Sequence, residues 1–173
     1  MIIIRYLSCL LLAGLLCPSV AGAGPYVGLS AARLDIDTPA ASTYPIAASV
    51  YIGYAISSHH LELVFMDGVN DYNLNQLTVG VNSVRSVFYR YSLSPKTHFK
   101  IDFILGASQV AINSTYQGVP GSVSDFSGMS YGIGFREAFW SIPSLSLTFD
   151  WIQLYHGEEM DINTMNFGVQ YEF

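Results

Sequence analysis

The feature that most constrains this chain is an alternation of residue types with a period of two. In residues 46–56 the even positions are apolar or aromatic, whereas the odd positions hold Ala, Ser, Tyr and Gly. The same alternation recurs in residues 99–107, 128–136, 145–151 and 165–173. Successive side chains of a strand point to opposite faces of a sheet. These five segments are therefore predicted to be β-strands with one apolar face and one small or polar face.

Three weaker segments, 26–35, 60–67 and 77–91, bring the number of predicted strands to eight. A soluble β-sandwich would also alternate, but its outer face would carry many charged side chains. Only 12% of this chain is charged and 51% is apolar, whereas soluble domains carry about 25% charged residues. The second face suits the narrow interior of a small barrel. We therefore predict an all-β fold, an eight-stranded antiparallel up-and-down transmembrane β-barrel, with the sandwich as the alternative.

The amino-terminal segment has the composition of a secretory signal peptide. It carries a single positive charge at Arg5, an apolar run to Leu16, and small residues at Ala21 and Ala23. We expect cleavage after Ala23, giving a signal peptide at 1–23 and a barrel domain at 24–173. Both cysteines, Cys9 and Cys17, would be removed, so disulfides are not expected; a lipidated Cys17 is the competing interpretation.

The predicted connections fall into two classes that alternate along the chain. Short connections lie near 57–59, 94–97 and 141–144, and longer polar ones lie near 37–44, 68–76, 113–125 and 157–163. All long connections would then meet at one rim, as the extracellular loops of outer-membrane barrels do. An aromatic girdle is expected near the opposite rim, formed by Tyr26, Tyr54, Tyr89, Tyr91, Phe139, Trp140, Tyr171 and Phe173.

The balance of charge restricts the partners. Seven Lys and Arg against thirteen Asp and Glu cannot provide the cationic surface that nucleic acid requires. Eight acidic residues lie in or beside the long loops: Asp35, Asp37, Asp67, Asp71, Asp125, Glu158, Glu159 and Asp161. Such a rim would repel lipopolysaccharide unless divalent cations bridge the two. The alternatives are contact with a cationic surface and simple solvation of the loops.

Short motifs across residues 24–173 resemble the small outer-membrane barrels of the opacity-protein and OmpA/OmpX type. They are Tyr26-Val27-Gly28-Leu29-Ser30, Leu61-Glu62-Leu63, Tyr89-Arg90-Tyr91, residues 131–136 and the ending Phe167 to Phe173. The resemblance implies a place in the outer membrane of a Gram-negative bacterium, among lipid and lipopolysaccharide. It also implies that the barrel-assembly machinery reads Phe173 as an assembly signal, and that the loops could bind a host or cell-surface ligand.

Charged residues on the small-residue face predict an interior network. Its members are Glu62, Arg90, Lys100, Asp102, Arg136, Asp150 and Glu172. Charges are costly both in lipid and unpaired in a closed interior, so Glu62 and Asp150 are expected to pair with Arg90 and Arg136. A structural plug and a narrow pore are both compatible with this pattern. Arg85 falls at a position whose side chain would face lipid. Either a β-bulge shifts the register there or the side chain reaches the lipid headgroups.

We predict no enzymatic activity, cofactor or metal site. Barrel enzymes that modify lipids use a His with a Ser and an acid, but the residue two positions after His156 is Glu158. His59 and His60 are adjacent, so on a strand their side chains point apart. The leading hypothesis is a surface-interaction protein with a structural or adhesin-like role. A lipid-modifying enzyme, similar to lipid A deacylases, and a narrow pore are the alternatives.

Overall fold

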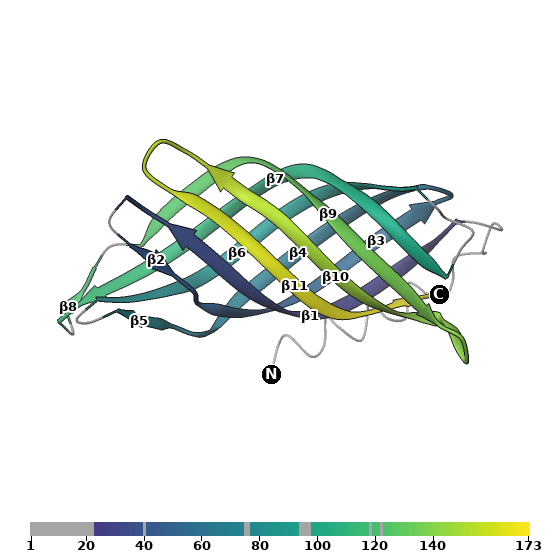
Figure 1. Cartoon of the computed structure of the whole chain (residues 1–173), viewed down its shortest axis with the longest axis horizontal. Coiled ribbons are helices and arrows are strands. Elements are labelled where there is room, and N and C mark those ends of the chain that lie inside the picture. Colours follow the sequence, from purple (N-terminus) through teal and green to yellow (C-terminus); the bar gives the residue numbers. More distant parts are fainter. Residues whose placement is uncertain (1–22, 40, 75–76, 94–97, 118, 122) are drawn as a thin grey trace, which may run out of the picture.

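The computed structural model describes residues 23–39, 41–74, 77–93, 98–117, 119–121 and 123–173. Eight long strands dominate these residues: β1 (Ala23–Asp37), β3 (Ile46–Ile56), β4 (His59–Asn70), β6 (Leu77–Ser92), β7 (Phe99–Tyr116), β9 (Ser124–Phe139), β10 (Ile142–His156) and β11 (Asp161–Glu172). Three short strands, β2 (Ser42–Thr43), β5 (Tyr72–Leu74) and β8 (Val119–Pro120), lie at the long-loop end (Figure 1). No helix among the described residues is long and apolar enough to span a membrane.

The eight long strands close into a barrel in which every neighbouring pair is antiparallel. Each strand pairs with the next in the chain, and β1 closes the ring by pairing with β11, from Tyr26 opposite Glu172 to Asp37 opposite Asp161. Closure gives each of these eight long strands a partner on both sides, which a lipid environment requires. The predicted up-and-down barrel is confirmed.

Strand pairing continues further toward the long-loop rim than the sequence predicted. The connection expected at 157–163 is a tight turn closed by a hydrogen bond from the Gly157 N–H to the Met160 carbonyl (3.0 Å), and β11 begins at Asp161. Likewise β7 runs to Tyr116, and β9 begins at Ser124. The predicted loop bounds were wrong, because polar side chains do not end a β-strand while its backbone stays hydrogen-bonded to the strands on both sides. Residues 94–97 and residues 1–22 of the predicted signal peptide 1–23 lie outside the described part.

The outward faces of the strands form an apolar band. Each long strand contributes at least one exposed large side chain, namely Leu29, Val50, Leu63, Val87, Leu105, Ile133, Phe149 and Val169. Toward the long loops the outward positions become polar, at Arg33, Asp67, Arg85, Gln109 and Ser127. This change marks the edge of the apolar band on the side of the long connections.

Arg85 lies at that edge. The bulge in the β6–β7 pairing falls between Val81 and Ser83, whereas the β4–β6 pairing is regular from His59 to Met66. The register is therefore not shifted at Arg85, and its exposed side chain points outward. The second sequence interpretation, an arginine at headgroup depth, agrees with this position.

Tyr26 does not belong to the aromatic girdle. Its side chain is 1% exposed and lies inside the barrel, whereas Tyr54, Tyr89, Tyr91 and Tyr171 are exposed on the wall. Gly53 makes room for Tyr26, because a Cβ there would overlap the Tyr26 ring, and Gly28 makes room for Tyr51 in the same way. The alternation of side chains along β1 turns Tyr26 inward. The prediction placed it in the girdle only because it lies near the amino-terminal end of the strand.

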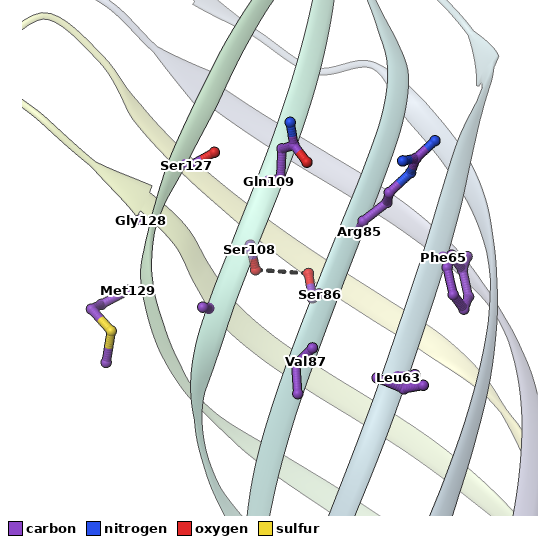
Figure 2. A pocket seen from close by; sticks show the side chains of 11 residues that line it. Leu63, Phe65, Arg85, Ser86, Val87, Ser108, Gln109, Ser127, Gly128 and Met129 are labelled. Carbon is purple, nitrogen blue, oxygen red and sulfur yellow. Dashed lines mark hydrogen bonds between the residues drawn. The ribbon is translucent and has the colours of Figure 1, made fainter.

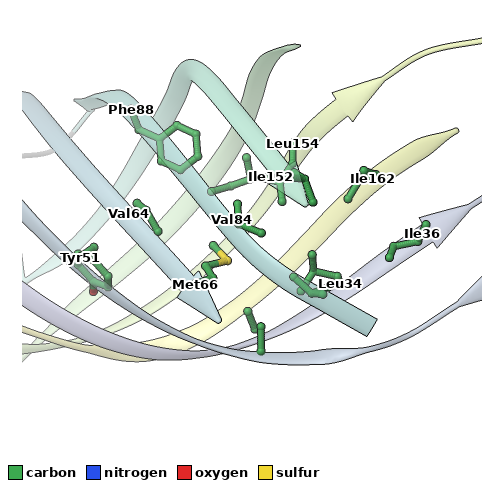
Figure 3. Packing of buried hydrophobic residues seen from close by; sticks show 14 of the residues in the cluster. Leu34, Ile36, Tyr51, Val64, Met66, Val84, Phe88, Ile152, Leu154 and Ile162 are labelled. Carbon is green, nitrogen blue, oxygen red and sulfur yellow. The ribbon is translucent and has the colours of Figure 1, made fainter. Parts of the chain in front are cut away.

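The interior has two layers along the barrel axis. The half nearer the long loops is filled by large aliphatic side chains, including Leu34, Met66, Val84, Ile152 and Leu154 (Figure 3). The sequence predicted only small and polar side chains there. The signal was present, because consecutive residues such as Trp151 and Ile152 are both apolar, which is the pattern of a strand buried on both faces.

Candidate functional site

Arg90 stands at the centre of the polar interior layer. Its guanidinium donates hydrogen bonds to Asp150 Oδ1 (2.9 Å), Asp150 Oδ2 (2.7 Å) and Glu62 Oε1 (3.0 Å). Asp150 lies on β10, which is three strands from β6 around the ring, so this pair crosses the lumen. The bidentate geometry with Asp150 is the strongest arrangement available to an arginine and a carboxylate.

Arg136 forms the second centre of the layer. Its Nη2 donates to Asp102 Oδ2 (2.7 Å) and to Ser92 Oγ (3.1 Å), while Nη1 lies 3.4 Å from Glu172 Oε1. The expected pairing of Arg136 with Asp150 or Glu62 was therefore wrong. Within the described ion pairs those two carboxylates belong to Arg90, because Arg136 lies closer to the turn end of the barrel, opposite Lys100 in the β7–β9 register.

The two centres are joined, and the network reaches the rim. Asp102 Oδ2 lies 3.9 Å from Arg90 Nη1, and Lys100 Nζ lies 3.8 Å from Glu172 Oε1. The structure thus brings all seven predicted interior residues together as three cations and four carboxylates. Lys100 and Glu172 are partly exposed, whereas the other five side chains are at most 8% exposed. Five charges are therefore effectively removed from water.

Polar residues that the sequence analysis did not assign to the network complete it. Tyr26 donates to Glu62 Oε2 (3.2 Å), and Ser92 donates to Asp102 Oδ1 (2.5 Å). Above them, Ser86, Ser108 and Ser130 form a chain of hydroxyl contacts of 2.7 Å across three strands. These residues lie on the same face of their strands as the charged residues, so the alternation in the sequence could have identified them. Buried carboxylates need such additional donors to offset their desolvation.

Ser92, His60 and Asp102 form the Ser, His and acid grouping that a hydrolase would need. His60 Nε2 lies 3.1 Å from Ser92 Oγ, but Ser92 gives its single proton to Asp102. His60 must therefore donate to Ser92, which is the reverse of general-base activation. The His60 Nδ1 atom is buried and has no partner among the described residues, so no acid orients the ring. Ser92 is also only 1% exposed.

His156 is likewise placed without a nucleophile. Its Nδ1 lies 2.5 Å from Asp161 Oδ1 beside the 157–160 turn; His156 is exposed and Asp161 is partly exposed. His59 points outward and contacts the Tyr89 hydroxyl (2.6 Å), while His60 points inward, as the strand parity predicted. In the described part of the chain, no three His, Cys, Asp or Glu side chains are grouped in a way that would hold a metal ion.

The acidic rim lies where the sequence placed it, at the end of the barrel opposite the 57–58 turn. Asp67, Asp71, Asp125, Glu158 and Glu159 are exposed there. The remaining three, Asp35, Asp37 and Asp161, are partly exposed; Asp37 accepts a hydrogen bond from Ser42 and Asp161 pairs with His156. Of the two arginines at this edge, Arg33 lies 4.5 Å from the Tyr44 ring centroid.

Phe173 lies beside the first strand at the turn end of the barrel. Its N–H donates to the Pro25 carbonyl (3.1 Å), and its ring meets the Tyr171 ring edge-on at 5.1 Å between centroids. The side chain is on the outer wall and 36% exposed. Phe173 is thus exposed at the turn end of the barrel, and its role as an assembly signal stays a prediction.

Comparison with known proteins identifies the family. Residues 7–173 match the outer membrane protein beta-barrel domain. The chain belongs to this family. Its barrel is accordingly a protein of the Gram-negative outer membrane, with the long connections on the extracellular side. None of the curated proteins matches the sequence.

Solved outer-membrane barrels share the fold at low sequence identity. Neisserial surface protein A is 16% identical, with 88% of this chain and 99% of that chain covered and a TM-score of 0.68. Ail, the attachment invasion locus protein of Yersinia pestis, solved with the heparin analogue sucrose octasulfate, is 13% identical over 89% and 100%, with a TM-score of 0.64. AlkL in lipid bilayers is 13% identical over 91% and 94%, with a TM-score of 0.52. At these identities the likeness extends to the fold alone.

Proposed function

We propose that this outer-membrane barrel is a non-enzymatic surface-interaction protein whose acidic loops bind cationic groups on a host or neighbouring cell. The observation that carries the proposal is the gathering of eight carboxylates at the extracellular end. They are held on a barrel whose strands continue into the loops, so the carboxylates occupy defined positions. Like charges gathered at one rim attract oppositely charged partners over distances of about 8 Å at physiological salt.

The interior favours a scaffold over a pore. Arg90 spans the lumen to Asp150, and a layer of aliphatic side chains fills the interior above it. An ion entering from the loop side would have to cross that apolar layer before reaching the charges, which is unfavourable for any charged solute. The hydrogen-bond direction at Ser92 also disfavours an enzymatic role.

The charge of the rim predicts a ligand unlike the polysulfated sugar in the Ail complex. A polyanion would be repelled by the carboxylates of this chain, whereas a basic polypeptide or a cationic surface would be attracted. Divalent cations could also bridge the rim to lipopolysaccharide. These two modes differ in their dependence on Ca²⁺, so one experiment distinguishes them.

The proposal can be tested with barrels in phosphatidylcholine nanodiscs passed over polylysine-coated and heparin-coated sensors. We expect salt-sensitive binding to polylysine and none to heparin. Neutralising four exposed loop residues (Asp67→Asn, Asp125→Asn, Glu158→Gln and Glu159→Gln) should abolish most of the binding. Glu137→Gln, an exposed carboxylate near the opposite rim, is the control and should bind like the wild type.

Three outcomes would contradict the proposal. Equal capture of the loop variant and the wild type would show that the rim is merely solvated. An equal loss of polylysine binding in the loop variant and in Glu137→Gln would show that binding follows the net charge of the protein and does not depend on the acidic rim. Binding of lipopolysaccharide vesicles only with Ca²⁺, and no binding to polylysine, would replace the cationic partner by the bridged mode.

A further inference from the structure

A shallow groove lies on the outer wall of the barrel, across β4, β6, β7 and β9. Its volume of about 600 Å³ is within the roughly 300–1,000 Å³ typical of small-molecule sites. The polar side chains Arg85, Gln109 and Ser127 line its extracellular end, and Leu63, Val87 and Met129 line the part below (Figure 2). The groove therefore has a polar head nearer the long loops and an apolar body nearer the turn end.

The strand register creates this depression. Val87, Ala107 and Met129 are direct neighbours on β6, β7 and β9, so a small side chain stands between two large ones. The next row toward the loops, formed by Ser86, Ser108 and Gly128, faces the interior and adds no side chain to the outer wall. The wall is thus lowered along β7, while Phe65 and Leu63 on β4 raise its edge.

The head of the groove carries a cation that forms no ion pair with any described residue. Arg85, Gln109 and Ser127 are consecutive neighbours across β6, β7 and β9, and all three are exposed. They offer a guanidinium, an amide and a hydroxyl, which are all donors to an anion. A guanidinium facing lipid is costly unless an anion accompanies it, and phosphate accepts two parallel N–H bonds from arginine.

The nearby carboxylates restrict which anion can reach this head. Asp67 and Asp125 are the next outward residues toward the loops on β4 and β9, two residues beyond Phe65 and Ser127 respectively. They would repel a phosphate approaching from the solution above. The same carboxylates act on a lipid phosphate, but an acyl chain in the apolar part of the groove adds favourable contacts that free phosphate lacks. This geometry favours a lipid over free phosphate.

We propose that this groove binds one phosphorylated glycolipid of the outer leaflet, the lipid A part of lipopolysaccharide. Its phosphate contacts Arg85, Gln109 and Ser127, and one acyl chain lies over Ala107 between Val87 and Met129. The proposal rests on the outer-membrane location of the barrel and is independent of the ligand of the acidic loops. It places a direct lipopolysaccharide contact beneath a rim that would otherwise repel that lipid.

The experiment measures lipid A retained by the folded barrel in phosphatidylcholine nanodiscs, using native mass spectrometry. Arg85→Gln removes the charge and keeps a polar side chain, and Ala107→Leu fills the groove while retaining Arg85. Arg85→Gln should lower retention about fivefold, the effect of about 1 kcal/mol for one cation at a membrane surface. Ala107→Leu should lower retention because the larger side chain occupies the place of the acyl chain. Arg33→Gln removes the other rim arginine, which lies outside the groove, and should retain lipid A like the wild type.

Several results would overturn the proposal. Wild-type retention in Arg85→Gln would exclude the phosphate contact, and wild-type retention in Ala107→Leu would exclude the acyl-chain contact. An equal loss in Arg33→Gln would indicate diffuse attraction to the rim. Competition by millimolar inorganic phosphate, or equal retention of dephosphorylated lipid A, would show that the headgroup and the chain are not recognised together. Heat-modifiable gel mobility verifies folding of each variant, and capture on polylysine is expected to be unchanged, which separates this test from that of the loops.

Discussion

Replacement of Arg90 by Met tests whether the interior network is a buried, coupled unit. The substitution keeps an unbranched apolar stem and removes the three hydrogen bonds to Asp150 and Glu62. Glu62 and Asp150 would remain as carboxylates whose side chains are 1% and 7% exposed. Breaking a buried pair in this way costs about 3–5 kcal/mol. We expect a loss of that size in the free energy of unfolding.

The control is the peripheral pair formed by Lys100 and Glu172, which is 3.8 Å apart and partly exposed. Solvent screening limits such pairs to about 0–1 kcal/mol, so Lys100→Met should cost no more than that. A third variant, Arg90→Met/Glu62→Gln/Asp150→Asn, removes the stranded charges together with the arginine. It should regain much of the loss, because neutral groups can replace a buried ion cluster at little cost.

The assay is reversible urea unfolding of the barrel in lipid vesicles, followed by tryptophan fluorescence and heat-modifiable gel mobility. The free energies of unfolding of the wild type, Arg90→Met, Asp150→Asn and Arg90→Met/Asp150→Asn form a double-mutant cycle. A loss below about 1 kcal/mol for Arg90→Met, with additive effects in the cycle, would refute the reasoning. It would mean that water reaches these charges and that the lumen is hydrated at this level.

Three further predictions concern packing, assembly and ions. Gly28→Ala should destabilise the barrel by about 1–3 kcal/mol, since its Cβ would overlap the Tyr51 ring; urea unfolding measures this, and Gly28→Ala/Tyr51→Leu should recover part of the loss. Deletion of Phe173 should lower the amount of heat-modifiable barrel in outer membranes, and wild-type amounts would contradict an assembly role. If divalent cations bridge the rim to lipopolysaccharide, a chelator should lower the thermal stability of wild-type barrels reconstituted with that lipid; an unchanged stability would exclude the bridge.

The strands and the faces of the interior charges could be predicted from the sequence. Alternation in segments such as 46–56 specifies a strand, and its parity specifies which side chains share a face. Glu62, Arg90 and Asp150 were therefore assigned to the interior before any pairing was known. The alternation depends only on the order of residues within one strand, so it can be identified from the sequence without knowing which strands pair.

The partners of those charges were decided only by the closed barrel. Arg136 contacts Asp102 and Glu172, and Asp150 contacts Arg90, because strand tilt and stagger set the height of each residue along the axis. The same stagger brings Arg85 beside Gln109 and places Ala107 between two large side chains. Alternation records the face of a residue but carries no information about its height on the barrel, and height determines which residues meet.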